Sequence, residues 1–241
     1  MRTKSFALLG LIVAIVSVSS GAERKPAATP AKKPDPAFAK VADTPGLPRV
    51  LLIGDSISIG YTADVRDLLQ GQANVHRIST NGGPTTNGLK NLKAWLGDGK
   101  WDVIHFNWGL HDLKYVGPKD DTITDVTASD SRQQVPLAQY EQNLKTLVTQ
   151  LQASGARLIW CATTPVPEGA KGRVPGDEVK YNAAAAGVMQ AAGVATNDLY
   201  GHAQLKLKEI QRRADVHYTP EGYRYLAEKV AAAIKAQLPR K

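Results

Sequence analysis

The chain has 241 residues, of which 43% are hydrophobic, 22% charged and 6% aromatic, and its formal net charge is +8. This apolar content excludes an intrinsically disordered chain, and a single cysteine, Cys161, excludes a small fold held together by disulfides. The length suits one domain of ordinary size or two small ones. The excess of basic residues would suit a nucleic-acid or membrane-surface partner, so its distribution along the chain matters.

Residues 1–22 have the layout of a secretory signal peptide. Arg2 and Lys4 precede an apolar run over 6–18, and small residues follow it. The run is shorter than the roughly 20 apolar residues that a membrane-spanning helix needs. We therefore expect cleavage after Ala22 and a periplasmic or secreted mature protein without a membrane span. An uncleaved short anchor is the alternative.

Residues 23–48 are expected to form a flexible linker, because they hold six of the 14 prolines and few apolar residues. Residues 1–22 carry a charge of +2 and the linker another +2, which leaves +4 for residues 49–241. Half of the basic surplus therefore lies outside the expected domain. No recognised binding module accompanies it, so a nucleic-acid partner is not expected.

The remaining sequence, 49–241, alternates strand and helix patterns and is expected to form one domain. Buried strands are predicted over 49–53, 75–78, 103–106, 158–162 and 194–199, and helices over 63–69, 89–96, 137–151, 179–192 and 220–238. Apolar strands separated by helices favour a parallel sheet covered on both faces, which is an α/β sandwich. In such sheets the functional groups gather at the carboxyl ends of the strands.

Four polar clusters lie at these strand ends or just before the last helix. They are Gly-Asp-Ser-Ile-Ser at 54–58, Asn-Gly-Gly at 81–83, Asn-Trp-Gly-Leu-His-Asp at 107–112 and Asp-Val-His-Tyr-Thr-Pro at 215–220. Each cluster alone is a weak signal, since turns and helix caps use the same residue types. All four, in this order and at these places, predict a catalytic site built by loops that parallel strands bring together.

With these clusters, residues 49–238 resemble the SGNH (GDSL-type) hydrolase superfamily. The resemblance implies a three-layer α/β/α sandwich with a flavodoxin-like parallel sheet of about five strands. It also implies a serine esterase that hydrolyses carboxylic esters, with Ser56 as the nucleophile and His217 as the base. Ser56, Gly83 and His111 would supply the donors of the oxyanion hole.

The sequence departs from the family pattern at two places. His111 stands where the family has asparagine. A neutral histidine also donates an N–H, but this donor lies at a different distance from the backbone than the asparagine amide. Ala214 stands three residues before His217, where the family usually has the triad acid, and the candidate acid Asp215 lies two before it. Neighbouring side chains of an extended loop point to opposite sides. Three outcomes are open: a local turn lets Asp215 reach the ring, a backbone carbonyl orients a Ser–His dyad, or catalysis is weak.

The loops over 113–135 and 164–177 are polar, which favours a polar or sugar ester over a lipid. Trp108 and Tyr115 are candidate substrate-binding residues, with a core position as the alternative for Trp108. Secretion and the resemblance together suggest short-acyl, O-acetyl esters of small or polymeric carbohydrates. The alternatives are a non-catalytic or weakly active relative that binds sugars or the cell wall, and a lipase or lysophospholipase.

Two aspartates beside the clusters are expected to have structural roles. Asp55 would bond turn amides next to the nucleophile, and Asp112 would brace the loop that holds His111. No cluster of Cys and His has metal-ligand spacing, so neither a metal nor another cofactor is predicted. No particular oligomeric state is predicted.

Overall fold

The computed structural model describes residues 35–119 and 121–239. The predicted signal peptide, and residues 23–34 of the predicted linker, lie outside the described residues. Within the described ranges, no helix combines the length and the apolar composition that crossing a bilayer requires.

Five parallel strands form the central sheet, in the order β2-β1-β3-β6-β7. Their bounds are Arg49–Ile53 for β1, Asn74–Arg77 for β2, Val103–Phe106 for β3, Arg157–Cys161 for β6 and Ala195–Asn197 for β7. This is the order of a flavodoxin-like sheet, in which the direction of winding reverses between β1 and β3. The α/β sandwich expected from the sequence is confirmed. In sheets of this order, ligands bind beside the loops at the reversal, which here follow β1 and β3.

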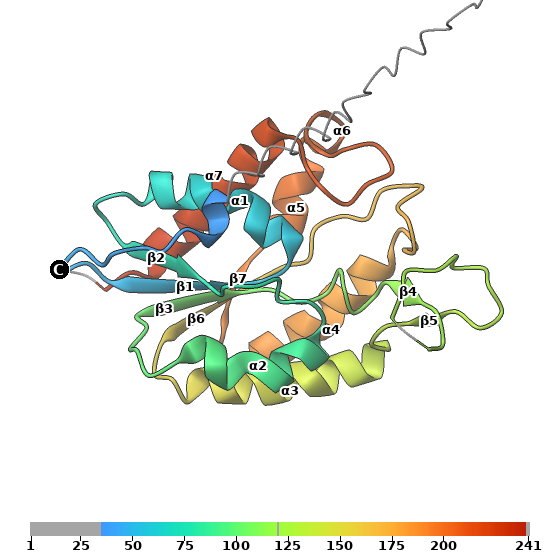
Figure 1. The fold of residues 1–241 in the computed structure, drawn as a ribbon, viewed down its shortest axis with the longest axis horizontal. Helices are drawn as coiled ribbons and strands as arrows, with labels where there is room; N and C mark the ends of the chain where they lie inside the picture. Colours follow the sequence, from blue (N-terminus) through green and yellow to red (C-terminus); the bar gives the residue numbers. More distant parts are fainter. Residues whose placement is uncertain (1–34, 120, 240–241) are drawn as a thin grey trace, which may run out of the picture. The chain divides into compact units, whose positions relative to one another are not determined.

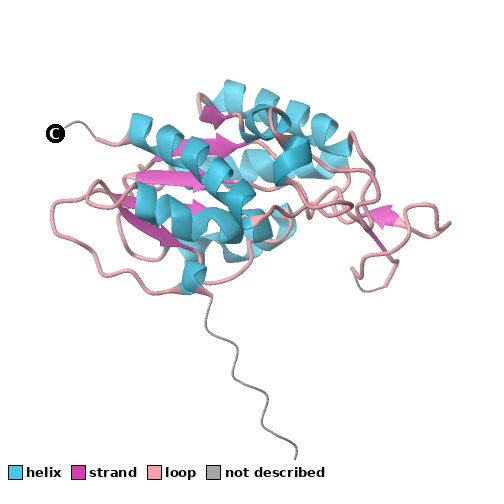
Figure 2. Ribbon diagram, turned by 90° about the horizontal axis from the view of Figure 1, so that it is seen from above, coloured by secondary structure: helices cyan, strands magenta, loops and turns pink. Residues whose placement is uncertain are grey.

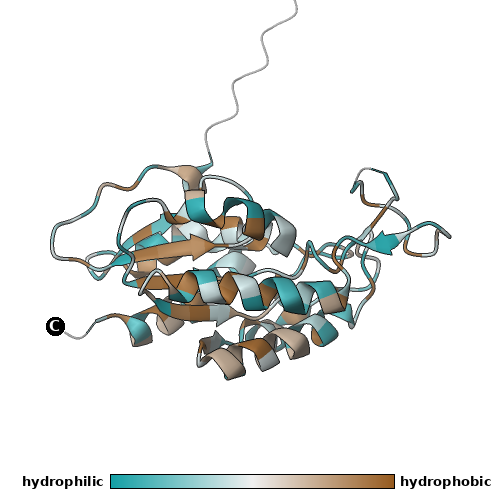
Figure 3. Ribbon diagram, turned by 90° about the horizontal axis from the view of Figure 1, so that it is seen from below, coloured by the Kyte–Doolittle hydropathy of each residue, from teal (hydrophilic) through white to brown (hydrophobic). Residues whose placement is uncertain are grey.

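Helices cover both faces of the sheet (Figure 1). On one face lie α1 (Ser56–Leu68), α5 (Leu199–Gln204), α6 (Leu207–Ile210) and α7 (Pro220–Gln237); on the other lie α2 (Thr85–Leu96), α3 (Leu137–Gln152) and α4 (Asp177–Ala192). The central strands β1, β3 and β6 are mostly apolar, whereas the outer sides of the helices are mixed and polar (Figure 3). One continuous core therefore fills both spaces between sheet and helices.

A short antiparallel hairpin extends the fold beyond the β3 end of the sheet. It pairs β4 (Tyr115–Val116) with β5 (Arg132–Gln133) inside the long loop that follows β3 (Figure 2). Two-residue strands leave almost no periodic pattern, so the sequence predicted only a polar loop here. The hairpin and the loop over 164–177 are tied together, because the Tyr115 N–H donates to the Gly172 carbonyl at 2.7 Å.

The predicted linker extends too far, since its last part packs on the domain. A 3-10 turn, η1 (Pro36–Phe38), buries Ala37, and the Arg66 guanidinium of α1 donates to the Pro36 carbonyl at 2.8 Å. Further along, the Thr44 N–H donates to the Asn74 side chain of β2 at 2.9 Å. Proline content alone misled the prediction, because these contacts join residues about 30 positions apart.

The docking of α1 on α7 brings the two ends of the domain together. At Gly60 of α1, a Cβ would lie 2.1 to 2.6 Å from ring atoms of Tyr223, so only glycine lets that ring approach. Helix α7 starts at Pro220, capped by the Thr219 side chain, which accepts from the Gly222 N–H. The loop just before α7 is thereby held over the first turn of α1.

Candidate active site

Ser56 is the first residue of α1, directly after the carboxyl end of β1. The buried Asp55 caps the helix, because its Oδ1 accepts the Ile57 N–H at 2.9 Å. Asp55 thus bonds a turn amide, as the sequence predicted. The first N–H groups of a helix have no intrahelical acceptor and carry positive potential. The Ser56 hydroxyl is therefore placed where negative charge is favoured.

His217 reaches Ser56 from the loop before α7. The Ser56 Oγ and His217 Nε2 atoms are 2.8 Å apart, although 161 positions separate the two residues. This is the distance of a nucleophile and a general base in contact. The structure brings together the serine and the histidine that the sequence singled out.

Asp215 completes a chain of three side chains. Its Oδ1 lies 2.6 Å from His217 Nδ1 and 3.2 Å from the His217 N–H. The loop is not extended: Ala214 has φ +52°, and the Asp215 N–H donates to the Arg212 carbonyl. Of the three arrangements left open, the structure has the local turn. Burial opposes ionisation, yet the hydrogen bonds and charge of His217 hold the pKa of Asp215 below its ordinary value.

The predicted oxyanion donors differ in whether their N–H groups are available to a substrate. The Gly83 N–H donates to the Asn81 side chain at 2.9 Å, and Gly83 has φ +62°, so the Asn-Gly-Gly turn satisfies its own amide. The structure therefore does not present this N–H as a free donor. His111 lies in the electrostatic field of His217 and Asp55, and burial lowers its pKa. A neutral imidazole keeps one N–H donor, which is what an oxyanion requires.

Asp112 fastens the His111 loop to the start of α2. Its Oδ1 accepts from the Thr85 N–H at 2.8 Å and from the Thr85 hydroxyl at 2.5 Å. The carboxyl is fully buried, and this burial raises its pKa to about 7. Asn143 of α3 donates to the same Thr85 hydroxyl at 2.9 Å, so three segments meet at one point. Asp112 braces this loop, as the sequence predicted.

Arg77, at the end of β2, supports the nucleophile turn from behind, and sequence reasoning missed it. Its Nη2 donates to the carbonyls of Gly54 and Asp55 and to the Ser58 hydroxyl, and its Nη1 donates to two further carbonyls. Burial lowers its pKa to about 10, which still leaves it charged near neutral pH. An isolated arginine at a strand end has no motif, so only its position in the fold identifies it.

Of the two candidate substrate-binding residues, the structure rules out Trp108 and leaves Tyr115 in the loop where the sequence analysis placed it. Trp108 is fully buried, and its ring centroid is 5.9 Å from that of Phe106 in the core. It cannot stack on a sugar, and the alternative of a core position is the correct one. Tyr115 is half-buried in the β4–β5 hairpin, where its backbone pairs with Gln133. Its role in substrate binding therefore stays a prediction.

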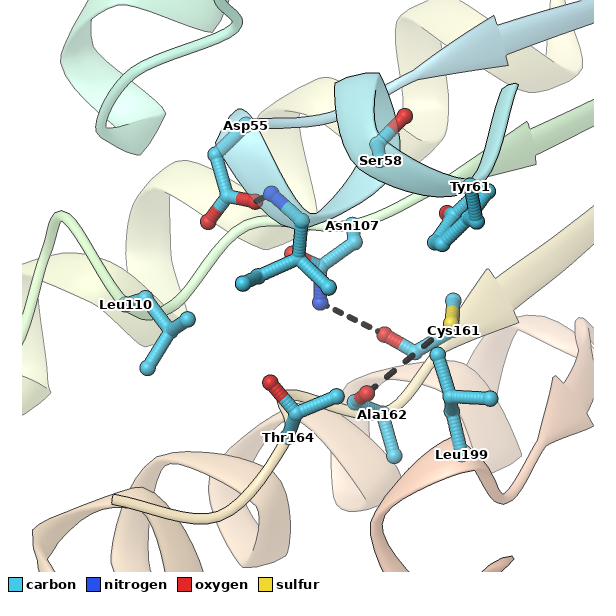
Figure 4. A pocket seen from close by; sticks show the side chains of 10 residues that line it. Asp55, Ser58, Tyr61, Asn107, Leu110, Cys161, Ala162, Thr164 and Leu199 are labelled. Atoms are coloured by element: carbon cyan, nitrogen blue, oxygen red, sulfur yellow. Dashed lines mark hydrogen bonds between the residues drawn. The ribbon is translucent and has the colours of Figure 1, made fainter. Parts of the chain in front are cut away.

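A small cavity lies beneath the nucleophile turn (Figure 4). Its lining includes Asp55 and Ile57, the two neighbours of Ser56, and Leu110 from the loop after β3. The volume of about 10 Å³ equals roughly one water-sized sphere. Asn107 and Thr164 also line it, and the Asn107 amide donates to the Cys161 carbonyl at 2.7 Å. Ser56, His111 and His217 are not among its lining residues, so this cavity lies behind the nucleophile turn and not between the catalytic side chains.

The arrangement can perform nucleophilic acyl transfer. Ser56 has a base in contact, the base has an acid in contact, and helix α1 and neutral His111 supply positive potential and a donor. Among residues 35–119 and 121–239, no group of three His, Cys, Asp or Glu side chains is arranged to hold a metal ion.

Comparison with known proteins agrees with this chemistry. The profile described as the GDSL-like Lipase/Acylhydrolase family matches residues 52–225, which include every residue of the candidate site. No curated protein sequence matches the chain significantly.

Solved structures share the fold at low sequence identity. The lipase/acylhydrolase from Enterococcus faecalis is 19% identical with a TM-score of 0.66, over 81% of this chain and 99% of that one. Axe2, an acetylxylan esterase from Geobacillus stearothermophilus, is 18% identical with a TM-score of 0.62, over 78% and 94%. The acetyl xylan esterase AlAXEase is 17% identical with a TM-score of 0.60, over 77% and 99%. At these identities the likeness establishes the three-layer fold.

Proposed function

Because the chain belongs to the GDSL-like lipase/acylhydrolase family and is a carboxylic ester hydrolase, we propose that it removes short acyl groups, above all acetyl, from carbohydrate esters. The observation that carries the catalytic assignment is the chain of contacts from Ser56 Oγ through the His217 ring to Asp215 Oδ1, at 2.8 and 2.6 Å. A relative that only binds sugars would not need this chain of contacts.

In the proposed mechanism, Ser56 Oγ attacks the ester carbonyl carbon while His217 Nε2 takes its proton. The carbonyl oxygen becomes an oxyanion, which the first N–H of α1 and the neutral His111 ring stabilise. The same Nε2 then gives its proton to the departing alkoxide, and an acyl-serine remains. Water attacks this ester with the proton transfers reversed, which releases the acid and restores Ser56. Asp215 stabilises the imidazolium that forms in both halves.

Gly83 would join the oxyanion hole only after a local change. Its N–H is bonded to Asn81 Oδ1, so it becomes a donor to substrate when that side chain turns away or shares the proton. One oxyanion donor typically contributes about 100- to 1,000-fold to the rate. The contribution expected of Gly83 is smaller than this, because breaking the Asn81 bond offsets part of it.

The preference for short acyl groups rests on the polar surroundings of the site and on the kinds of esterase that share the fold. The loops around the site are polar, and acetylxylan esterases are among the proteins that share the fold.

The test is a comparison of p-nitrophenyl esters from acetyl to octanoyl, followed by acetylated xylo-oligosaccharides. We expect kcat/KM to fall steeply beyond the butanoyl ester, and Ser56→Ala to abolish turnover. Equal rates for wild type and Ser56→Ala would refute the enzyme assignment and favour a binding protein. A preference for the octanoyl ester would favour a lipase or lysophospholipase.

We also propose that the protein is exported through its N-terminal 22 residues. The support is the sequence layout: a basic start, an apolar run over 6–18 and small residues before Glu23. N-terminal sequencing of the mature protein should begin at Glu23. A mature protein that still starts at Met1 would refute cleavage, and recovery in the cytoplasmic fraction would refute export.

A further inference from the structure

Two basic side chains flank His111 at the mouth of the catalytic site. Residues 109–113 form a helical turn, in which the Leu113 N–H donates to the Gly109 carbonyl at 2.9 Å. Lys114 follows this turn, and the next residue, Tyr115, donates its N–H to the Gly172 carbonyl at 2.7 Å, which brings Lys114 close to Arg173. From the opposite loop, the Arg173 Nε donates to the Leu110 carbonyl at 3.0 Å, which holds the guanidinium next to His111.

Neither Lys114 nor Arg173 has a carboxylate partner of its own. In the part of the chain that the structure describes, no ion pair includes Lys114 or Arg173. The carboxylates whose charge reaches them are engaged elsewhere. Asp121 pairs with Arg132, Asp55 caps α1, and Asp215 bonds His217.

The side chains of Lys114 and Arg173 are also partly buried, which is unusual for charged groups without a partner. Both are half-buried, and burial, which is the largest cause, lowers the pKa of each. The charge of Arg173 lowers the pKa of Lys114 further. Partial burial of two like charges without a partner is unfavourable, and an anion bound between them would relieve it.

The backbone around the pair is well fixed. A Cβ on Gly172 would lie 2.4 Å from the Ile123 side chain, so the 164–177 loop and the β4–β5 hairpin are in close contact there. Beyond this contact, Arg173 and Lys171 line a groove of about 730 Å³ between the two loops. Arg173 therefore belongs both to the surroundings of the catalytic residues and to a groove large enough for sugar units.

We infer that Lys114 and Arg173 form an anion-binding subsite, and that the alcohol part of the natural ester carries a carboxylate or phosphate group next to the scissile bond. The substrate class is then an acetylated acidic sugar rather than a neutral one. The groove that Arg173 lines has room for sugar units, so we assign the basic pair to the alcohol side of the ester. This inference rests on the proposed function and narrows its substrate class from carbohydrate esters in general to esters of acidic sugars.

The test compares three acetylated methyl glycosides: a glucuronoside, its neutral methyl amide and a glucoside 6-phosphate. For wild type we expect kcat/KM to be at least about tenfold higher for an anionic ester than for the neutral amide, as for one charge-assisted contact. Whichever anion gives the higher value identifies the group that the pair binds. The advantage should shrink as NaCl is raised, since salt screens a half-exposed contact.

The variants Lys114→Met and Arg173→Gln should each lower the ratio of anionic to neutral kcat/KM about threefold to tenfold, and the double variant should bring it near one. The ratio compares two substrates on the same protein, so a general loss of activity cancels. Lys114→Met is the cleaner variant, because Arg173 also holds the Leu110 carbonyl. Lys93→Met, an exposed lysine in the last turn of α2, is the matched control and should leave the ratio unchanged.

Two results would overturn the inference in distinguishable ways. Hydrolysis of all three esters at similar kcat/KM by wild type would refute the anion subsite and leave the esterase assignment intact. Hydrolysis of none of them, nor of p-nitrophenyl acetate, would refute the proposed function and the subsite with it. A ratio that stays high in the double variant would show that other residues recognise the anion.

Discussion

Replacing Asp215 by alanine tests how much a solvent-exposed acid contributes to this catalytic site. The carboxylate lies 2.6 Å from His217 Nδ1, and the side chains of the pair are 39% and 36% exposed. When His217 takes the serine proton, it becomes a cation whose charge centre is about 4 Å from the carboxylate. Opposite charges at this separation attract by about 1 kcal/mol in water and by about 4 kcal/mol at the effective dielectric of a protein surface.

The exposure of the pair places the expected contribution between these limits. We take about 1.5 to 3 kcal/mol, which corresponds to a fall in kcat of roughly tenfold to 150-fold for Asp215→Ala. Replacing a fully buried triad acid lowers kcat by about 10⁴-fold. Asp215→Asn should be slower than Asp215→Ala, because an amide can donate to Nδ1 and so keep the ring proton on Nε2, where it blocks the serine.

The assay is initial-rate hydrolysis of p-nitrophenyl acetate, and the Ser56→Ala variant gives the background rate without the nucleophile. Asp67→Ala, an exposed carboxylate on α1, is the control for a general change in surface charge. A fall of less than threefold for Asp215→Ala would show that His217 is oriented without the acid. A fall of 10⁴-fold would show that the pair is desolvated when substrate binds, and either result would refute the electrostatic reasoning.

Three further predictions concern packing, pH and support of the nucleophile. Gly60→Ala should destabilise the fold by about 1–3 kcal/mol in thermal melts, because its Cβ would overlap the Tyr223 ring. Gly187→Ala, where a Cβ meets nothing within 4 Å, should instead stabilise α4 slightly; equal effects would contradict the steric argument. The carboxyl of Asp112 has its pKa raised to about 7 in the folded protein, so the folded state holds a proton that the unfolded chain has released above pH 4. Stability should therefore fall by up to about 1.4 kcal/mol per pH unit between pH 4 and 7, and Asp112→Asn should flatten this slope in urea unfolding; an unchanged slope would assign it to other groups. Arg77→Met should lower both the melting temperature and kcat. Arg77→Lys should not restore kcat, because a lysine ammonium lacks the planar guanidinium that donates to the Gly54 and Asp55 carbonyls. A wild-type kcat in Arg77→Met would show that the turn needs no such support.

The parts of the fold that repeat a pattern could be read from the sequence. Runs such as Val50–Ile53 and Val103–Phe106 are apolar because both faces of the central strands are covered, and this burial leaves a continuous signal. Ser56 and His217 were found because each lies beside a strand end or helix start with a family motif. Helix α1 begins at Ser56 rather than at 63, since its first turn contains polar and small residues that give no periodic signal.

Features set by contacts between distant residues could not be read in this way. The reach of Asp215 depends on the left-handed backbone at Ala214, and alanine carries no preference for that region. The engagement of the Gly83 N–H depends on the rotamer of Asn81. Trp108 stands next to the site in sequence, but its ring belongs to the layer between the sheet and α2 and α3, where Tyr140 donates to its carbonyl at 2.9 Å.

The 161 positions between Ser56 and His217 also concern how the protein is made. A ribosome produces Ser56 161 positions before His217, so a nascent chain that ends between the two residues lacks the pair. Ester hydrolysis can begin only when α7 has docked on α1, which requires closing a loop of nearly the whole domain. Recovery of activity during refolding should thus follow the last long-range contact to form, and a time course that runs ahead of α7 docking would contradict it.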